Sequence, residues 1–244
     1  MVVSVRCYAE LNDFLPPSQR QVAFVAECHA GTSAKDLLEG LGVPHTEVDL
    51  LLVNGEPVTF DHRLADGDRV VAYPVFEAFD VAAVSRVRPE PLREVRFVLD
   101  GHLGRLAAFL RLAGFDALYL RDADDPELAA TAAAERRILL TRDQGLLKRR
   151  EVTHGFYVRG ARPARQLREV IDRFDLRRLL RPFTRCMRCN GLLHPVEKHA
   201  VASAVPPRSL EAFDQFLQCE GCGRVYWRGS HYERLVRLIA DLGE

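Results

Sequence analysis

Apolar and polar residues alternate over the first 75 residues in a way that is typical of half-buried β-strands. The predicted strands lie at residues 2–8, 21–27, 50–53 and 69–75. Between the second and third strands, Thr32 or Ser33 can cap a helix over 34–41. The dipeptide Asn54-Gly55 is a strong hairpin-turn sequence. The order strand, strand, helix, strand, strand predicts a small α+β domain.

From residue 94 onward, short apolar runs alternate with helix-like segments. The predicted strands lie at 94–99, 116–120, 137–141 and 155–159. The predicted helices lie at 103–113 and 126–136, with another starting at 166 and a last one at 231–242. Strands that alternate with helices indicate an α/β domain with a parallel sheet and helices outside it. Residues 81–93, which are rich in arginine and proline, read as a linker.

Composition favours a folded, globular chain, because 48% of the residues are hydrophobic and 28% are charged. No apolar run approaches the roughly 18 residues that a membrane-spanning helix needs, and the first residues do not resemble a secretory signal. We therefore expect a cytoplasmic protein without a membrane partner. The net charge of zero hides an asymmetry: residues 1–80 carry 5 basic and 13 acidic side chains, whereas 81–244 carry 29 and 21. The second part is suited to a polyanion, although compositional drift is an alternative because arginine outnumbers lysine 31 to 3.

Acidic side chains follow three of the predicted strands. Asp100 and Asp143 come directly after two of them, and Asp125, with Asp122 and Asp124 near it, follows a third. If these strands are neighbours, their carboxylates meet at one edge of the sheet, where oxygen ligands favour Mg²⁺ or Mn²⁺. Such ions activate water for phosphodiester hydrolysis. The alternative is that each aspartate caps the helix that follows it, and the two roles are compatible.

Four cysteines have the spacing of a metal site. Cys186 and Cys189 form one C-x-x-C pair and Cys219 and Cys222 form another, with 29 residues between the pairs. Two such pairs close a tetrahedral Zn²⁺ site, and four thiolates leave no open position, so the zinc is expected to be structural. The separation exceeds the usual 15–20 or so residues, which predicts an inserted loop. Asn190-Gly191 and Gly223 supply the unusual backbone angles that such knuckles need. Two disulfides or a redox dithiol are the alternatives.

Basic and aromatic side chains near these groups are candidates for nucleic-acid binding. They are Arg105, Arg142, Lys148, Arg149, Arg177, Arg178, Trp227 and Arg228. The first four flank the acidic positions and can hold phosphate, but they can equally form solvated helix faces. Arg177 and Arg178 belong to a dense arginine run between the two regions. Trp227 can stack on an unpaired base or serve as core for a small zinc ribbon.

The first domain resembles the ubiquitin-like β-grasp sulfur carriers. The resemblance rests on the Val-Asn-Gly turn and on Leu64-Ala65-Asp66-Gly67-Asp68-Arg69-Val70 before the closing strand. Those carriers end in a Gly-Gly tail that is activated as a thiocarboxylate. Here residues 74–80 continue into more chain instead. The resemblance therefore implies a ubiquitin-like module that docks a protein partner or packs within the chain.

The rest of the chain resembles the Mut-seven-C RNase family, in which a PIN-like ribonuclease domain precedes a zinc ribbon and, in some members, follows a ubiquitin-like module. The matching pieces lie at 100–107, 110–116, 125–128 and 135–143, followed by the Tyr-Trp-x-Gly-Ser-His run at 226–231. The resemblance implies a nuclease that acts on RNA with Mg²⁺ or Mn²⁺. By position, Asp100, Asp125 and Asp143 are its acidic ligands, and a fourth acidic residue is not assigned.

The expected architecture has three domains. A β-grasp domain covers 1–80, a PIN-like α/β domain covers 94–182 after the linker 81–93, and a zinc ribbon with a C-terminal helix covers 183–244. The expected function is endoribonucleolytic cleavage. The alternative is a non-catalytic RNA-binding or protein-interaction adaptor held by the four-cysteine zinc site. The acidic first domain can also inhibit the basic remainder by covering it.

Overall fold

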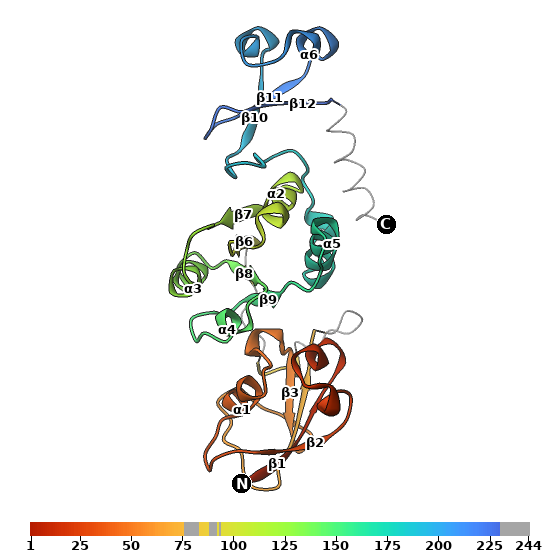
Figure 1. Cartoon of the computed structure of the whole chain (residues 1–244), viewed down its shortest axis with the longest axis vertical. Coiled ribbons are helices and arrows are strands. Elements are labelled where there is room, and N and C mark those ends of the chain that lie inside the picture. Colours follow the sequence, from red (N-terminus) through yellow and green to blue (C-terminus); the bar gives the residue numbers. More distant parts are fainter. Residues whose placement is uncertain (76–82, 88–91, 93, 230–244) are drawn as a thin grey trace. The chain divides into compact units, whose positions relative to one another are not determined.

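The computed structural model describes residues 1–75, 83–87, 92 and 94–229. The chain divides into two units, residues 1–93 with 124–157 and residues 94–123 with 158–244. Figure 1 labels helices and strands of both units. Each unit is described by itself below. The predicted helix over 231–242 and most of the predicted linker lie outside the described residues.

The N-terminal sheet of the first unit has five strands in the order β2-β1-β5-β3-β4. The strands are β1 (Val2–Cys7), β2 (Phe24–Glu27), β3 (Leu50–Val53), β4 (Glu56–Pro57) and β5 (Arg69–Tyr73). β1 runs parallel to β5, and the other pairs are antiparallel. Helix α1 (Ala34–Gly40) is capped by Ser33, whose hydroxyl accepts a hydrogen bond from the Asp36 amide at 3.1 Å. The predicted order of elements is confirmed, with β4 added, and the arrangement is that of a ubiquitin-like β-grasp domain.

The alternating pattern of this domain buries one face of the sheet against α1. Val3, Val5 and Val70 of the sheet join Leu37 and Leu38 of the helix in one core cluster. The predicted hairpin turn is present, with positive φ angles of 55° at Asn54 and 92° at Gly55. Short 3₁₀ helices connect the elements, and they are η1 (Ala9–Phe14), η2 (Pro17–Gln19) and η3 (His45–Glu47).

The first unit also contains residues 124–157. Its elements are α3 (Asp125–Ala134), β8 (Ile138–Thr141), α4 (Gln144–Leu147) and β9 (Gly155–Tyr157). β8 and β9 are parallel. This segment contacts η3 of the β-grasp domain: His45 Nε2 lies 2.9 Å from the Val152 carbonyl, and the Tyr157 amide donates to Glu47 Oε1 at 2.6 Å.

The second unit begins with the parallel strands β6 and β7. Its elements before the ribbon are β6 (Arg96–Leu99), α2 (Gly104–Leu112), β7 (Asp116–Tyr119), α5 (Pro163–Arg173) and η4 (Arg177–Leu179). Gly114 ends α2 with a φ of 101°, as the sequence predicts. Helix α5 starts three residues before the predicted position, at Pro163, because proline is well suited to the first turn of a helix. Parallel strand pairs joined by helices confirm the predicted α/β character.

A three-stranded antiparallel ribbon completes the second unit. Its strands, in the order β10-β11-β12, are β10 (Leu193–Val196), β11 (Phe216–Cys219) and β12 (Val225–Trp227). The predicted insertion between the cysteine pairs contains η5 (Lys198–Val201) and α6 (Pro207–Ala212). Across the residues described, no helix has the length and apolar character needed to cross a membrane.

Candidate functional site

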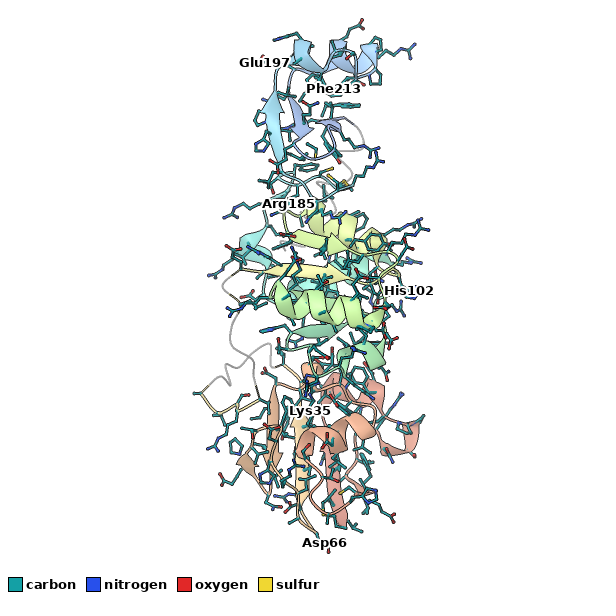
Figure 2. The ribbon with its side chains drawn as sticks, turned by 90° about the vertical axis from the view of Figure 1, so that its left-hand side faces the viewer. Lys35, Asp66, His102, Arg185, Glu197 and Phe213 are labelled. Carbon is teal, nitrogen blue, oxygen red and sulfur yellow. The ribbon has the colours of Figure 1, made fainter. Side chains whose placement is uncertain are left out.

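The four predicted cysteines gather at one end of the ribbon. Their Sγ atoms all lie within 4.8 Å of one another, and Figure 2 shows sulfur atoms near the segment that carries Arg185. Cys186 Sγ lies 3.6 Å from Cys222 Sγ, and Cys189 Sγ lies 3.4 Å from Cys219 Sγ. A disulfide needs about 2.05 Å, whereas a zinc tetrahedron with bonds of about 2.3 Å places its sulfurs roughly 3.8 Å apart. The cluster therefore fits a metal ion such as zinc, and the disulfide alternative does not fit.

Equivalent backbone hydrogen bonds shape the two C-x-x-C loops. In each loop, the amide of the residue after the second cysteine donates to the carbonyl of the first cysteine. Asn190 N donates to Cys186 O, and Gly223 N donates to Cys219 O, both at 3.0 Å. Asn190 and Gly223 have positive φ angles of 72° and 69°, which confirms the predicted backbone requirement at both positions. Gly191 is needed for space, because a Cβ there would lie 3.0 Å from Cys219 Sγ.

Arg111 and Asn190 attach the first cysteine loop to α2 and β7. The Arg111 side chain is buried, and its guanidinium donates to the carbonyls of Ala117 at 2.8 Å and Arg188 at 2.8 Å. Asn190 Nδ2 donates to Asp116 Oδ1 at 2.8 Å, and Asn190 Oδ1 accepts from the Ala117 amide at 3.1 Å. The cysteine cluster is thus fixed to the α/β part of its unit by side-chain contacts.

The surroundings of Cys186 and Cys189 shift their pKa values in opposite directions. Burial raises the pKa of Cys186, but hydrogen bonds from the Tyr226 hydroxyl, at 3.1 Å, and from neighbouring amides outweigh burial and lower it to about 6. For Cys189, burial and the neighbouring sulfurs raise the pKa to about 12. A thiolate at one cysteine therefore disfavours deprotonation of its neighbour. This is expected for a set of metal ligands whose negative charge a cation must balance.

Asp100 lies in a tightly packed turn after β6. The residue is only 7% exposed, and its Oδ1 accepts a hydrogen bond from the His102 amide at 2.9 Å. The turn leaves no room for larger residues, since a Cβ on Gly101 would lie 2.5 Å from the Arg121 carbonyl oxygen. The N-cap of α2 is Leu103, without a side-chain cap, so Asp100 does not cap this helix. His102, labelled in Figure 2, is exposed beside it.

The other two predicted acidic ligands lie in the first unit. Asp143 caps α4, with Oδ1 accepting from the amides of Gly145 at 2.6 Å and Leu146 at 3.3 Å. Helix α3 is capped by Asp124, which accepts from the Glu127 amide at 2.9 Å, so the exposed Asp125 is the first residue of the helix and not its cap. Asp100 belongs to the second unit, and convergence of the three carboxylates stays a prediction.

The predicted nucleic-acid-binding residues lie in different settings. Arg105, Arg142, Arg178 and Arg228 are exposed, whereas Lys148 donates to the Glu39 carbonyl at 2.8 Å. Arg177 pairs with Asp172 at 2.9 Å, and Arg149 lies 3.8 Å from a Glu151 oxygen. Trp227 is half-buried and packs against Phe216, with ring centroids 6.4 Å apart. These contacts do not test RNA binding, so the RNA-binding role of these eight residues stays a prediction.

Sequence reasoning missed the side chains that support the cysteine cluster. Arg111, Asn190 and Tyr226 act through contacts between residues that are 40 to 77 positions apart, and no spacing rule reveals such partners. Only the position of Asn190 directly after a C-x-x-C pair indicated its backbone conformation.

Comparisons with known proteins find two domain families in the chain, in the order that the sequence resemblance implies. Residues 95–239 match the model of the Mut7-C RNAse domain, and residues 1–80 match the Mut7-C ubiquitin model. No curated protein matches the chain.

Two solved structures of small archaeal modifier protein 1 from Haloferax volcanii are similar to a short part of the chain. The first is 17% identical, covers 30% of this chain and 95% of its own length, and has a TM-score of 0.24. The second is 16% identical, covers 32% of this chain and 100% of its own length, and has a TM-score of 0.26.

Proposed function

The chain belongs to the Mut7-C RNAse family, and from this premise we propose that it is a metal-dependent ribonuclease that hydrolyses RNA phosphodiester bonds. The match to the RNAse domain over residues 95–239 is the single observation that carries the proposal. The proposal includes a PIN-like fold for residues 94–182, which requires β6 and β8 to lie side by side in one sheet. In that arrangement, Asp100 and Asp143 follow adjacent strands and share one edge.

Asp100, Asp125 and Asp143 would hold Mg²⁺ or Mn²⁺, because carboxylate oxygens are the ligands these ions prefer. When bound, such an ion supplies an activated water and stabilises charge on the phosphate. The donor set fits this role: Asp124 caps α3, which leaves the exposed Asp125 carboxylate outside the cap. Asp143 uses Oδ1 for its cap, and a carboxylate has a second oxygen. Arg105 and Arg142, which are exposed, would hold the RNA phosphates.

The cysteine cluster would hold a structural zinc ion through Cys186, Cys189, Cys219 and Cys222. The sulfur separations of 3.4 Å and 3.6 Å support four-sulfur coordination. Four protein ligands leave no position for water or substrate, so the ion would stabilise the ribbon and take no part in hydrolysis. The ribbon would contribute to RNA binding through Arg177, Arg178, Trp227 and Arg228, and the ubiquitin-like domain would bind a protein partner.

The proposal is tested by cleavage of single-stranded RNA by Asp143→Asn in the presence of Mg²⁺ or Mn²⁺. Asparagine caps helices about as well as aspartate, so the α4 cap is retained while the negative charge is lost. We expect cleavage to fall by more than about 100-fold, since even indirect partners of a metal ligand are worth about 10- to 100-fold. Thermal unfolding is expected to stay close to that of the parent chain.

The matched control is Asp61→Asn, the same chemical change at an exposed residue of the β-grasp domain. Cleavage by Asp143→Asn at the rate of Asp61→Asn would remove the acidic site from the proposal. RNA binding without cleavage under either metal ion would favour the alternative, a non-catalytic RNA-binding or protein-interaction adaptor.

A further inference from the structure

The ribbon contains an open cleft beside the second cysteine loop. Its volume is about 530 Å³, and Arg188, Cys222, Arg224, Tyr226 and Trp227 are among the residues that line it. This volume falls within the roughly 300–1,000 Å³ of sites that bind small organic ligands. The lining combines two cationic side chains with two aromatic ones, which is the chemistry that recognises a nucleotide.

One arginine of the cleft comes from each cysteine loop. Arg188 lies between Cys186 and Cys189, and Arg224 follows Gly223 directly after the second pair. Both side chains are exposed, and across the described residues neither guanidinium has a hydrogen bond or an ion pair. Two exposed guanidinium groups at one cleft are suited to a phosphate, which they can bind through paired N–H donors.

Trp227 offers the apolar surface of the same cleft. Tyr226 and Trp227 are successive residues at the end of β12, and both line the cleft. The Tyr226 hydroxyl is held by Cys186 Sγ at 3.1 Å, whereas Trp227 packs on Phe216 and remains half-buried. Trp227 is therefore a fixed aromatic platform at the cleft, and an indole is a good stacking partner for any base.

We propose that this cleft binds one unpaired nucleotide of RNA, with its base on Trp227 and its phosphate on Arg188 and Arg224. The inference rests on the proposed ribonuclease function for its choice of ligand. It changes the sequence-based prediction in one respect, since in the part of the chain that is described Arg224, not Arg228, lines the cleft. Bases within a duplex are already stacked, so the cleft selects single-stranded RNA.

Trp227 makes the test direct, because it is the only tryptophan in the chain. The full-length, zinc-loaded protein is titrated with a short single-stranded RNA without added Mg²⁺ or Mn²⁺, so that binding is measured apart from cleavage. We expect the RNA to quench tryptophan emission, and a duplex of the same sequence to quench it much less. Arg224→Ala is expected to weaken binding about tenfold and to reduce the slope of log affinity against log salt by about 0.7, the value of one phosphate contact on a single strand.

The matched control is Arg208→Ala, which removes an exposed arginine from α6 of the same ribbon. A competing explanation is that the two arginines only balance the charge of zinc with four thiolates, so zinc content is measured for every variant. The proposal is overturned if RNA leaves the emission unchanged, if duplex quenches equally, or if Arg224→Ala and the second variant Arg188→Ala bind RNA as Arg208→Ala does. Lost cleavage with retained quenching would contradict only the ribonuclease proposal, and retained cleavage without quenching would contradict only the cleft.

Discussion

At the scale of single residues, Asn190 has two roles, in the turn of the first cysteine loop and in docking that loop, and the sequence pattern indicates only the first. Its φ of 72° lets the first cysteine loop turn, and its amide group bonds both Ala117 and Asp116. Asparagine tolerates the left-handed conformation better than most residues, which is why a residue other than glycine can stand there. The turn was predictable from the C-x-x-C spacing, but the docking was not, because β7 lies more than 70 residues earlier in the chain.

Two substitutions separate these tasks. Asn190→Gly keeps the backbone conformation but loses both side-chain hydrogen bonds, for an expected loss of about 1–3 kcal/mol in the free energy of unfolding. Asn190→Ala loses the same bonds and adds about 1–2 kcal/mol of left-handed strain. We therefore expect the order wild type, glycine, alanine in urea unfolding followed by Trp227 emission. Equal stability of the two variants would show that the backbone conformation carries no cost.

Asp68 gives the β-grasp domain a dependence on pH. Its carboxylate accepts hydrogen bonds from the Ala65 amide at 2.7 Å and from Asn54 Nδ2 at 2.8 Å. These bonds lower the pKa of Asp68, and the Ala65 bond has the larger effect. The folded state therefore favours the charged form, and the contribution present at neutral pH is lost as pH falls through the lowered pKa.

The variant Asp68→Asn is expected to be less stable than the parent chain at pH 7, by less than about 1 kcal/mol because the group is largely solvated. The difference should shrink as the solution is acidified below about pH 4, where carboxyl groups become protonated. Chemical unfolding at a series of pH values measures it. The matched control is Asp61→Asn, the same change at an exposed aspartate of the same domain.

At the scale of elements, local patterns were sufficient wherever a strand or helix has its own boundary residues. The hairpin at Asn54-Gly55, the Ser33 cap of α1 and the Gly114 end of α2 all follow from short sequences. The ribbon strands were not predicted, because β10 and β12 contain only four and three residues. In addition, β10 pairs with β11 across the insertion. The structure shows that Asp124 caps α3. The sequence did not predict this, because three aspartates lie close together there and local propensity does not choose between them.

The contact between η3 and the segment 124–157 provides a prediction at this scale. His45 Nδ1 lies 2.7 Å from Glu39 Oε1, and Nε2 lies 2.9 Å from the Val152 carbonyl oxygen. His45→Phe keeps a ring against Phe60 but loses both hydrogen bonds, for an expected loss of about 1–3 kcal/mol. Hydrogen exchange should become faster in residues 138–157 in particular.

The control for this prediction is His29→Phe, which changes an exposed histidine of the same domain. Unchanged exchange in residues 138–157 of His45→Phe, relative to His29→Phe, would mean that η3 does not stabilise this segment.

At the scale of the whole molecule, the parts differ in what stabilises them. In the β-grasp domain, 17 buried residues lie in one cluster with Val87 of the predicted linker. Among the residues that the structure describes, the ribbon has two clusters of three buried residues each, and two of those six are the cysteines Cys186 and Cys219 of the proposed metal site. So small an apolar core does not offset the conformational entropy of the ribbon, and the proposed zinc ion would supply most of its folding free energy. Sequence spacing predicted the cluster of four cysteines, because the two C-x-x-C pairs can be recognised whatever the length of the insertion between them.

Removal of the proposed zinc ion is therefore expected to unfold the ribbon and to leave the β-grasp domain folded. A strong chelator should shift Trp227 emission to longer wavelength. By unfolding the backbone, it should also make the chain after Arg185 and Arg224, which flank the cysteine pairs, susceptible to trypsin. Mass spectrometry of the digest should recover residues 1–75 as a protected region, since their core contains no metal ligand. Cys222→Ser is expected to reproduce the effect without chelator. If confirmed loss of zinc changed neither emission nor digestion, the ribbon would have to be stabilised by its docking through Arg111 and Asn190 alone.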